Sequence, residues 1–247
     1  MYLATGLFPY GVAKTGTDDT SALADSVAQQ LEMALAVGLL NDGDKLPTEI
    51  DLAAEMGVST VTLRQALSIL RGKRIIETRR GRGGGSYVRD SSVYSRDQVD
   101  HQLRTRSIDE LRDLGDARAS AAGSAARLAA LRALPEDLGR MRKFAEEFQA
   151  AQASAAYRSA DSRFHIEVGV AAQSPRLTMT IVQLQGETAP LLWAPDAASA
   201  DEAAREHFLL VAAIEARDAY GAQTLAVEHC EREARVLIDR HLKLAAA

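Results

Sequence analysis

Apolar residues recur every three or four positions along most of this chain, which is the spacing of one face of a helix. Segment 21–40 carries them at Leu23, Val27, Leu31 and Leu35. A shorter segment follows, beginning where Thr48 and Asp51 have the form of a capping box and ending at Gly57, and a third begins at Ser59. Two short helices joined by a tight turn that contains a glycine predict a helix-turn-helix.

The hydrophobic period changes from helical to alternating after Gly72. Residues 74–79 and 86–89 have the composition of short strands, and a glycine-rich turn at 80–85 separates them. A β-hairpin directly after a helix-turn-helix predicts a winged helix over residues 21–90. Residues 1–20 lack the basic start and apolar core of a secretion signal, and we expect them to form a flexible tail.

Positive charge gathers in the winged-helix segment, although the formal net charge of the chain is -5. The cations of its third helix and hairpin are Arg64, Arg71, Lys73, Arg74, Arg79, Arg80, Arg82 and Arg89. A local basic surface on an acidic protein favours contact with the phosphates of DNA. Glycine-rich arginine loops also cradle nucleotide phosphates, but that arrangement needs a helix after the loop, and here a strand follows.

Residues 107–247 show helical periods and no strand pattern, which predicts an all-helical bundle. Ser107 and Glu110 have the capping-box form and open the first long helix. Pro190, inside a later helical segment, is expected to kink or end that helix. The polar segment 91–106 is interpreted as a linker between the two domains, in part helical. The predicted fold class is therefore mainly α, with the small β-hairpin confined to the N-terminal domain.

Four side chains of the C-terminal domain are candidates for a metal site. Asp161 and His165 lie four positions apart in a helical segment, so both project from one face. His207 and His229 each lie eleven residues from a predicted turn at Asp218. If the two segments fold back as a helical hairpin, both rings sit roughly 16 Å from the turn, at ~1.5 Å per residue. The rings would then be level, and a third helix could complete a cluster of one aspartate and three histidines.

Several interpretations of these residues stay open. Imidazole and carboxylate groups bind zinc, nickel or manganese, and open coordination positions could take a chelating acid or activate water. Histidines in helices also serve as surface or core residues, or hydrogen-bond an effector without a metal. His101 and His241 are assigned no role. The single cysteine, Cys230, is interpreted as a core residue, and it excludes an intramolecular disulfide. The single cysteine favours a reducing compartment. Because no apolar run is long enough to cross a bilayer, we expect a cytoplasmic location.

The N-terminal motifs follow one another in a family-specific order: Leu46-Pro47-Thr48-Glu49, Leu52-Ala53, Gly57-Val58-Ser59, Leu63-Arg64-Gln65-Ala66-Leu67, Leu70 and Gly81-Arg82-Gly83. Over about residues 22–89 they resemble the DNA-binding domain of the GntR family of bacterial transcriptional regulators. The resemblance implies that the third helix enters the major groove and the wing tip reaches toward the minor groove. The DNA-binding residues it implies are Thr48, Ser59, Thr60, Thr62, Arg64, Arg79, Arg82 and Gly83. Ile50 and Thr60 stand where related regulators often carry arginine, so the operator sequence cannot be carried over.

The C-terminal half resembles the FCD ligand-binding domain found in many GntR regulators. The residues that carry this resemblance are Asp161, Phe164, His165, Glu206, His207, Ala213, Ile214, Asp218, 226–229, 111–118 and 128–130. It implies that Asp161, His165, His207 and His229 hold a divalent metal ion, and that a small organic acid binds in the same pocket. Arg118 would pair with the carboxylate of that acid, or instead form a salt bridge on the helix surface. Ala121 and Ser174 depart from the glutamate and asparagine usual at their positions.

Together these patterns predict a dimeric transcriptional regulator that binds a two-fold operator in double-stranded DNA. A small carboxylate effector, bound with a divalent metal cofactor in the domain at 107–247, would change operator affinity by favouring one arrangement of the bundle. A metal-free sensor of the same family and a metal-dependent hydrolase are the alternatives. The enzyme is disfavoured because no further acid or base is poised near the motif, so we expect neither an enzyme nor a membrane partner.

Overall fold

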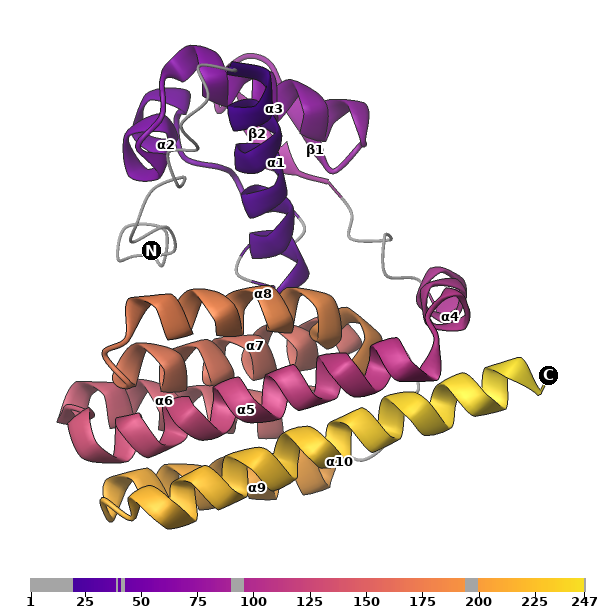
Figure 1. Cartoon of the computed structure of the whole chain (residues 1–247). Helices are drawn as coiled ribbons and strands as arrows, with labels where there is room; N and C mark the ends of the chain where they lie inside the picture. Colours follow the sequence, from indigo (N-terminus) through magenta and orange to yellow (C-terminus); the bar gives the residue numbers. More distant parts are fainter. Residues whose placement is uncertain (1–19, 39, 41–42, 90–95, 194–199, 247) are drawn as a thin grey trace. The chain divides into compact units, whose positions relative to one another are not determined.

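The computed structural model describes residues 20–38, 40, 43–89, 96–193 and 200–246 (Figure 1). These residues divide into two compact units, one formed by the elements from α1 to β2 and the other by those from α4 to α10. The tail predicted at 1–20 lies outside the described residues except for Thr20, which begins α1. No described helix combines the length and the apolar character needed to span a membrane.

The N-terminal unit is a winged helix, as predicted. Its elements are α1 (Thr20–Ala36), α2 (Glu49–Met56), α3 (Thr60–Gly72), β1 (Ile76–Arg79) and β2 (Gly85–Val88). The strands pair antiparallel, with Ile76 opposite Val88 and Arg79 opposite Gly85. The Thr48 side chain accepts a hydrogen bond from the backbone N–H of Asp51 at the start of α2. Gly57 ends α2 with φ 66°, a left-handed conformation that glycine adopts without steric cost.

The apolar faces predicted from the sequence form the core of this unit. Buried aliphatic and methionine side chains from all three helices and both strands meet in one cluster: Val27, Leu31, Leu40, Leu46, Leu52, Met56, Leu63, Leu67, Leu70, Ile76 and Val88. The hairpin therefore covers the helix-turn-helix through one inward-facing residue at the end of each strand, which leaves the remaining hairpin positions less buried.

The C-terminal unit consists of helices, with no strand among its described residues. The helices are α4 (Arg96–Thr105), α5 (Ile108–Arg132), α6 (Pro135–Gln149), α7 (Ser154–Ala171), α8 (Pro175–Leu192), α9 (Ala200–Glu215) and α10 (Ala219–Ala245). Ser107 and Glu110 close the predicted capping box at the start of α5. α8 runs two residues past Pro190, to Leu192.

The two longest helices, α5 and α10, lie side by side in the bundle (Figure 1). Two glycines of α5 face α10, because a Cβ at Gly115 would lie 2.6 Å from Ala234 Cβ and a Cβ at Gly123 would lie 2.6 Å from Val227 Cγ2. Real Cβ atoms do not approach other atoms so closely. The missing side chains thus permit the close packing of these helices, which the abundance of alanine in the sequence also serves.

Segment 91–106, interpreted above as a linker, contains the helix α4. Val99 and Leu103 of α4 are fully buried in the apolar core of the C-terminal unit. Arg240 of α10 donates a hydrogen bond to Asp100 at 2.5 Å, and His241 Nδ1 lies 2.9 Å from the carbonyl oxygen of Leu103. Because α4 shares the core and the polar contacts of this unit, we propose that the C-terminal domain begins at α4 rather than at Ser107.

Candidate functional site

Three helices of the C-terminal unit bring the four candidate metal ligands together. Asp161 and His165 lie one turn apart on α7, His207 lies on α9 and His229 on α10. All four are buried, and one ligand atom from each lies within 4.8 Å of the others. Asp161 Oδ1 is 3.5 Å from Nε2 of both His165 and His207, and Nε2 of His165 and His229 are 3.2 Å apart.

The hairpin of α9 and α10 sets the level of two of these histidines. Arg217 adopts φ 56° at the turn, and the Asp218 side chain accepts a hydrogen bond from the backbone N–H of Gly221 to cap α10. The rings of His207 and His229 consequently lie opposite each other, with centroids 5.1 Å apart. The geometry follows from equal spacing on either side of the turn, as the sequence pattern predicted.

Neighbouring side chains orient the cluster. The Nδ1 of His229 lies 2.6 Å from Glu206 Oε2, and Arg232 holds the same carboxylate. The Gln185 amide donates to Asp161 Oδ2 at 3.1 Å. The ring of His207 stacks on Phe164 with centroids 4.1 Å apart. Such contacts fix the orientation of each histidine ring. A carboxylate that pairs with one ring nitrogen also makes the other nitrogen a stronger ligand for a metal.

Burial and nearby charge shift the pKa values of two cluster residues, Asp161 and His207. Burial raises the pKa of Asp161. His165 and His207 together lower it by more than burial raises it, so the pKa lies well below its usual value. Burial lowers the pKa of His207, and this outweighs the opposing effect of Asp161. An ionised carboxylate and a neutral imidazole are the forms that bind metal ions.

The residues present fit a divalent metal ion. Asp161 Oδ1 and His207 Nε2 are buried without a hydrogen-bond partner among the described residues, and leaving such groups unpaired is costly. In a tetrahedral site with bonds of about 2.0–2.2 Å, neighbouring ligand atoms lie roughly 3.3–3.6 Å apart. Three of the ligand pairs in this cluster, at 3.2 Å, 3.5 Å and 3.5 Å, are close to that range, and all four ligand atoms lie within 4.8 Å of one another. Nitrogen and oxygen ligands of this kind suit zinc, nickel or manganese.

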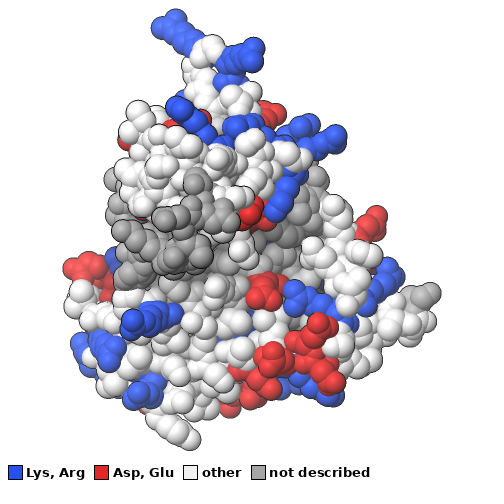
Figure 2. Space-filling model, turned by 45° about the horizontal axis from the view of Figure 1, so that its top comes forward, with Lys and Arg blue, Asp and Glu red and all other residues white. Residues whose placement is uncertain are grey.

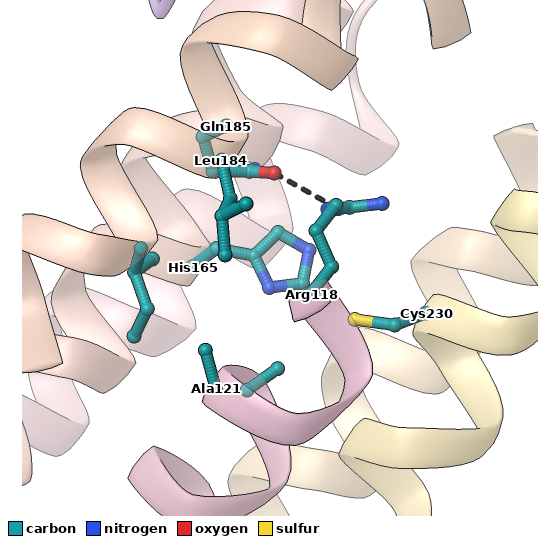
Figure 3. Close-up of a pocket in the computed structure, with 8 residues that line it drawn as sticks. Arg118, Ala121, His165, Leu184, Gln185 and Cys230 are labelled. Atoms are coloured by element: carbon teal, nitrogen blue, oxygen red, sulfur yellow. Dashed lines mark hydrogen bonds between the residues drawn. The ribbon is translucent and has the colours of Figure 1, made fainter. Parts of the chain in front are cut away.

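A small pocket adjoins the cluster (Figure 3). Its empty volume is about 230 Å³, open solvent included, and its wall comprises Arg118, Ala121, Ala122, His165, Ile181, Leu184, Gln185 and Cys230. The pocket is small, and its mixed polar and apolar wall would take only a small ligand. Burial raises the pKa of the Cys230 thiol to about 12, which leaves it protonated and unsuited to metal ligation.

Arg118, expected either at the effector or in a surface salt bridge, lies at this pocket in a buried salt bridge. Its Nη1 is 2.8 Å from Glu233 Oε2, and its Nη2 donates to Gln185 Oε1 at 2.8 Å (Figure 3). Burial lowers the pKa of Arg118, but the combined effect of Glu233, Cys230 and Asp161 raises it more, so the guanidinium stays charged. Burial raises the pKa of Glu233, whereas His229 and Arg118 lower it to a net value below the ordinary one.

Three residues around the cluster were not predicted: Gln185, Glu206 and Glu233. Glu206 directly precedes His207, and Glu233 follows His229 by four positions, so a search for polar residues one turn from each ligand would have found Glu233. Gln185 lies on α8, which carries no predicted ligand, and no sequence signal links it to Asp161.

The predicted DNA-binding residues of α2 and α3 divide into exposed and buried ones. Thr48 and Ser59, the caps of these helices, are exposed, and Thr60 is half-buried. Arg64 is exposed and donates to Glu49 Oε2 at 2.6 Å. Thr62 is 3% exposed and its hydroxyl meets that of Ser59 at 2.8 Å. Since almost none of its surface is accessible, Thr62 is better described as part of the helix cap than as a contact to DNA.

The wing presents the other predicted residues. Arg79, Arg82 and Gly83 are exposed, and the turn contains Gly81 and Gly83 at φ 92° and 91°. The Tyr87 hydroxyl donates to the Gly83 carbonyl at 2.6 Å, which ties the turn to β2. Figure 2 shows Lys and Arg side chains gathered on the N-terminal unit, with few acidic side chains among them. The wing thus combines a constrained backbone with exposed positive charge.

Fold and sites together define a DNA-binding protein of the winged-helix class with a helical domain able to hold a metal ion. Residues 23–85 match the model of the bacterial regulatory proteins of the gntR family, and residues 113–232 match the FCD domain. The chain belongs to the GntR family and is a transcriptional regulator rather than an enzyme.

Named relatives agree with this assignment. The chain is 40% identical over 228 residues to RmpR of Mycobacterium gastri, named as an HTH-type transcriptional regulator, covering 91% of this chain and 83% of the relative. It is 30% identical over 173 residues to the Glc operon transcriptional activator of Escherichia coli, covering 68% and 67%. It is 31% identical over 163 residues to a protein named for regulating an L-lactate dehydrogenase operon of Escherichia coli, covering 64% and 62%.

Among solved structures similar in fold is Escherichia coli McbR/YncC, with a TM-score of 0.52 and 22% sequence identity. The match covers 89% of this chain and 98% of that one. At this identity the likeness extends to the fold and not to the ligand.

Proposed function

We propose that this regulator senses a small organic acid at a divalent metal centre and changes its affinity for DNA in response. The observation that carries the proposal is the buried cluster of Asp161, His165, His207 and His229, whose ligand atoms lie within 4.8 Å of one another beside a pocket lined by Arg118. The protein acts as a homodimer on a two-fold operator, because the winged helix reads one half-site.

The DNA contacts we propose come from the half-buried Thr60 and the exposed residues Thr48, Ser59, Arg64, Arg79, Arg82 and Gly83. Hydroxyls and backbone N–H groups at helix starts suit phosphate oxygens, and arginines suit phosphates or guanine edges. Arg64 meets DNA by exchanging its exposed partner Glu49 for a phosphate or a base. Such an exchange costs little, because exposed ion pairs contribute roughly 0–1 kcal/mol.

The metal ion would be held by the four cluster residues, with Glu206 orienting His229 and Gln185 orienting Asp161. Zinc, nickel or manganese bound there would supply a Lewis-acidic position for the oxygen atoms of a chelating acid. Arg118, at the pocket wall, would attract the negative charge of the acid. One relative of this chain is named as a regulator of an L-lactate dehydrogenase operon, which makes small hydroxy acids the first effector class to test.

The test combines metal content with DNA binding. Genome-wide mapping of bound DNA identifies an operator, and fluorescence anisotropy then measures its affinity with and without L-lactate and other small acids. His207→Ala is expected to lower bound metal below a tenth of the parent value and abolish the acid response, while unliganded DNA affinity changes less than threefold. His101→Ala, an exposed histidine of α4, is the matched control and should behave like the parent.

Three outcomes would each contradict a different part of this proposal. A parent protein that contains far less than one metal ion per chain and still responds to an acid indicates the metal-free sensor. A His207→Ala variant that responds like the parent excludes the metal pocket from sensing. Failure to bind any mapped duplex at low salt would contradict the DNA-binding assignment instead.

A further inference from the structure

Glu233 is a second carboxylate beside the histidine cluster. It lies on α10, one turn after His229, and is 1% exposed. Arg118 pairs with Oε2 of this carboxylate, whereas Oε1 has no hydrogen-bond partner among the described residues. A buried carboxylate oxygen without a donor is costly, so the position of Oε1 calls for an explanation beyond packing.

The two oxygens of Glu233 face different groups. Oε2 lies 2.8 Å from Arg118 Nη1, and Oε1 lies 3.4 Å from His229 Nε2. That same nitrogen faces His165 Nε2 at 3.2 Å, so it is the nitrogen turned toward the proposed metal position. The separation of 3.4 Å is within the range found between the four predicted ligands. Glu233 therefore bridges the effector arginine and the edge of the cluster.

A salt bridge alone does not account for this arrangement. Glu167 of α7, another buried glutamate, accepts a hydrogen bond from Arg140 Nε at 2.8 Å and does not line the pocket. Glu233 has an arginine neighbour at the same distance, yet Oε1 turns from it toward His229. Its second oxygen is thus available to a cation at the cluster.

We propose that Glu233 is an internal carboxylate of the metal centre, which occupies the position beside His229 and Arg118 that an external acid must take. The inference rests on the metal-binding function proposed above. Its chemical consequence is competition: an acid gains the metal and Arg118 only by displacing Glu233. Acids whose only donor group is one carboxylate are then excluded. Acids with a second chelating oxygen are favoured, because they form more contacts than the one that is lost when Glu233 is displaced.

The test uses full-length protein loaded with Co²⁺, whose visible absorption reports its ligands, and acetate as the probe. Glu233→Ala removes the internal carboxylate and leaves space for acetate between Arg118 and the cluster. We expect acetate to change the Co²⁺ spectrum of Glu233→Ala with a Kd at least tenfold lower than in the parent protein. Glu167→Ala opens space beside Arg140 instead and should match the parent. A difference of less than tenfold between Glu233→Ala and the parent overturns the proposal.

Glu233→Gln keeps the experiment decisive if Glu233→Ala does not fold. The amide has nearly the size of the carboxylate but is a poor metal ligand. Co²⁺ affinity, measured by competition with a chelating dye, should fall at least fivefold and the visible spectrum should change. Unchanged affinity and spectrum in Glu233→Gln also overturn the proposal. A parent protein that takes up no Co²⁺ would instead contradict the metal site itself, so the two failures are distinct.

Discussion

Two arginine–glutamate pairs of similar length show how the two units of this protein differ. Arg118 and Glu233 approach to 2.8 Å with side chains only 5% and 2% exposed, whereas Arg64 and Glu49 approach to 2.6 Å with side chains 65% and 38% exposed. Water screens the exposed Arg64–Glu49 pair and competes for hydrogen bonds with both partners. The buried Arg118–Glu233 pair is shielded from water, so each partner depends on the other. Distance alone therefore does not tell what an ion pair contributes.

The comparison extends to the sites as wholes. In the helical unit, the candidate ligands are buried on three helices and are oriented by neighbouring side chains, so the site is preorganised. On the winged helix, the proposed DNA contacts are exposed side chains at helix starts and on a hairpin. Burial suits selective binding of one small ion or acid, and exposure suits rapid, salt-dependent contact with a polyanion.

The largest effect is expected from Arg118→Ala. It leaves the Glu233 carboxylate buried without its cation, which costs about 3–5 kcal/mol in the free energy of unfolding. Arg64→Ala breaks the exposed pair with Glu49 and should cost no more than about 1 kcal/mol. Urea denaturation of both variants measures the contrast. Equal losses would show that burial does not separate the two pairs.

A smaller loss is expected from Gly123→Ala in α5. The added Cβ would lie 2.6 Å from Val227 Cγ2 of α10, and such overpacking costs about 1–3 kcal/mol. Gly139→Ala in α6 is the matched control, because a Cβ there meets nothing within 4 Å. It should stabilise the helix by roughly 0.5–1 kcal/mol. The midpoints of thermal denaturation of the two variants should thus shift in opposite directions. Midpoint shifts of the same sign would contradict close packing as the role of Gly123.

Removal of one helix cap should have a still smaller effect. Ser107→Ala deletes the side-chain oxygen that accepts the backbone N–H of Glu110 at the start of α5, a loss of about 1 kcal/mol. Ser124→Ala, at an exposed position within the same helix, removes a hydroxyl without removing a cap and should be neutral or slightly stabilising. Urea midpoints of the two variants provide the test. A Ser107→Ala protein as stable as the Ser124→Ala protein would rule out the capping contribution.

The smallest effect on stability is expected from Arg82→Ala, because its side chain is exposed on the wing. Its effect should appear in DNA binding instead. Loss of one phosphate contact reduces the slope of log affinity against log salt by about 1. Anisotropy titrations at several salt concentrations measure that slope. An unaltered slope together with unaltered affinity would place the wing tip away from DNA.

Local signals in the sequence were enough for the elements and for the family. Capping residues such as Thr48 and Ser107, the glycines of the turns and the helical period of apolar residues act over one or two turns, so they can be recognised without a fold. The spacing of His207 and His229 about Asp218 even predicted which residues would face each other. We propose that α4 belongs to the C-terminal domain, a boundary that the sequence did not indicate because α4 is polar overall and Val99 and Leu103 give it only a short apolar stripe.

The sequence by itself determined that there is a winged helix, that a helical domain follows, and that one aspartate and three histidines can converge. It did so because the elements follow from local periodicity and capping signals, and because the ligand positions follow from spacing within α7 and about the turn between α9 and α10. The tertiary structure alone decided that Gln185 reaches Asp161, that Arg118 faces Glu233 and that Thr62 is turned inward. Those details depend on how the side chains are buried, and burial, with the exclusion of water that it brings, arises only when the helices pack.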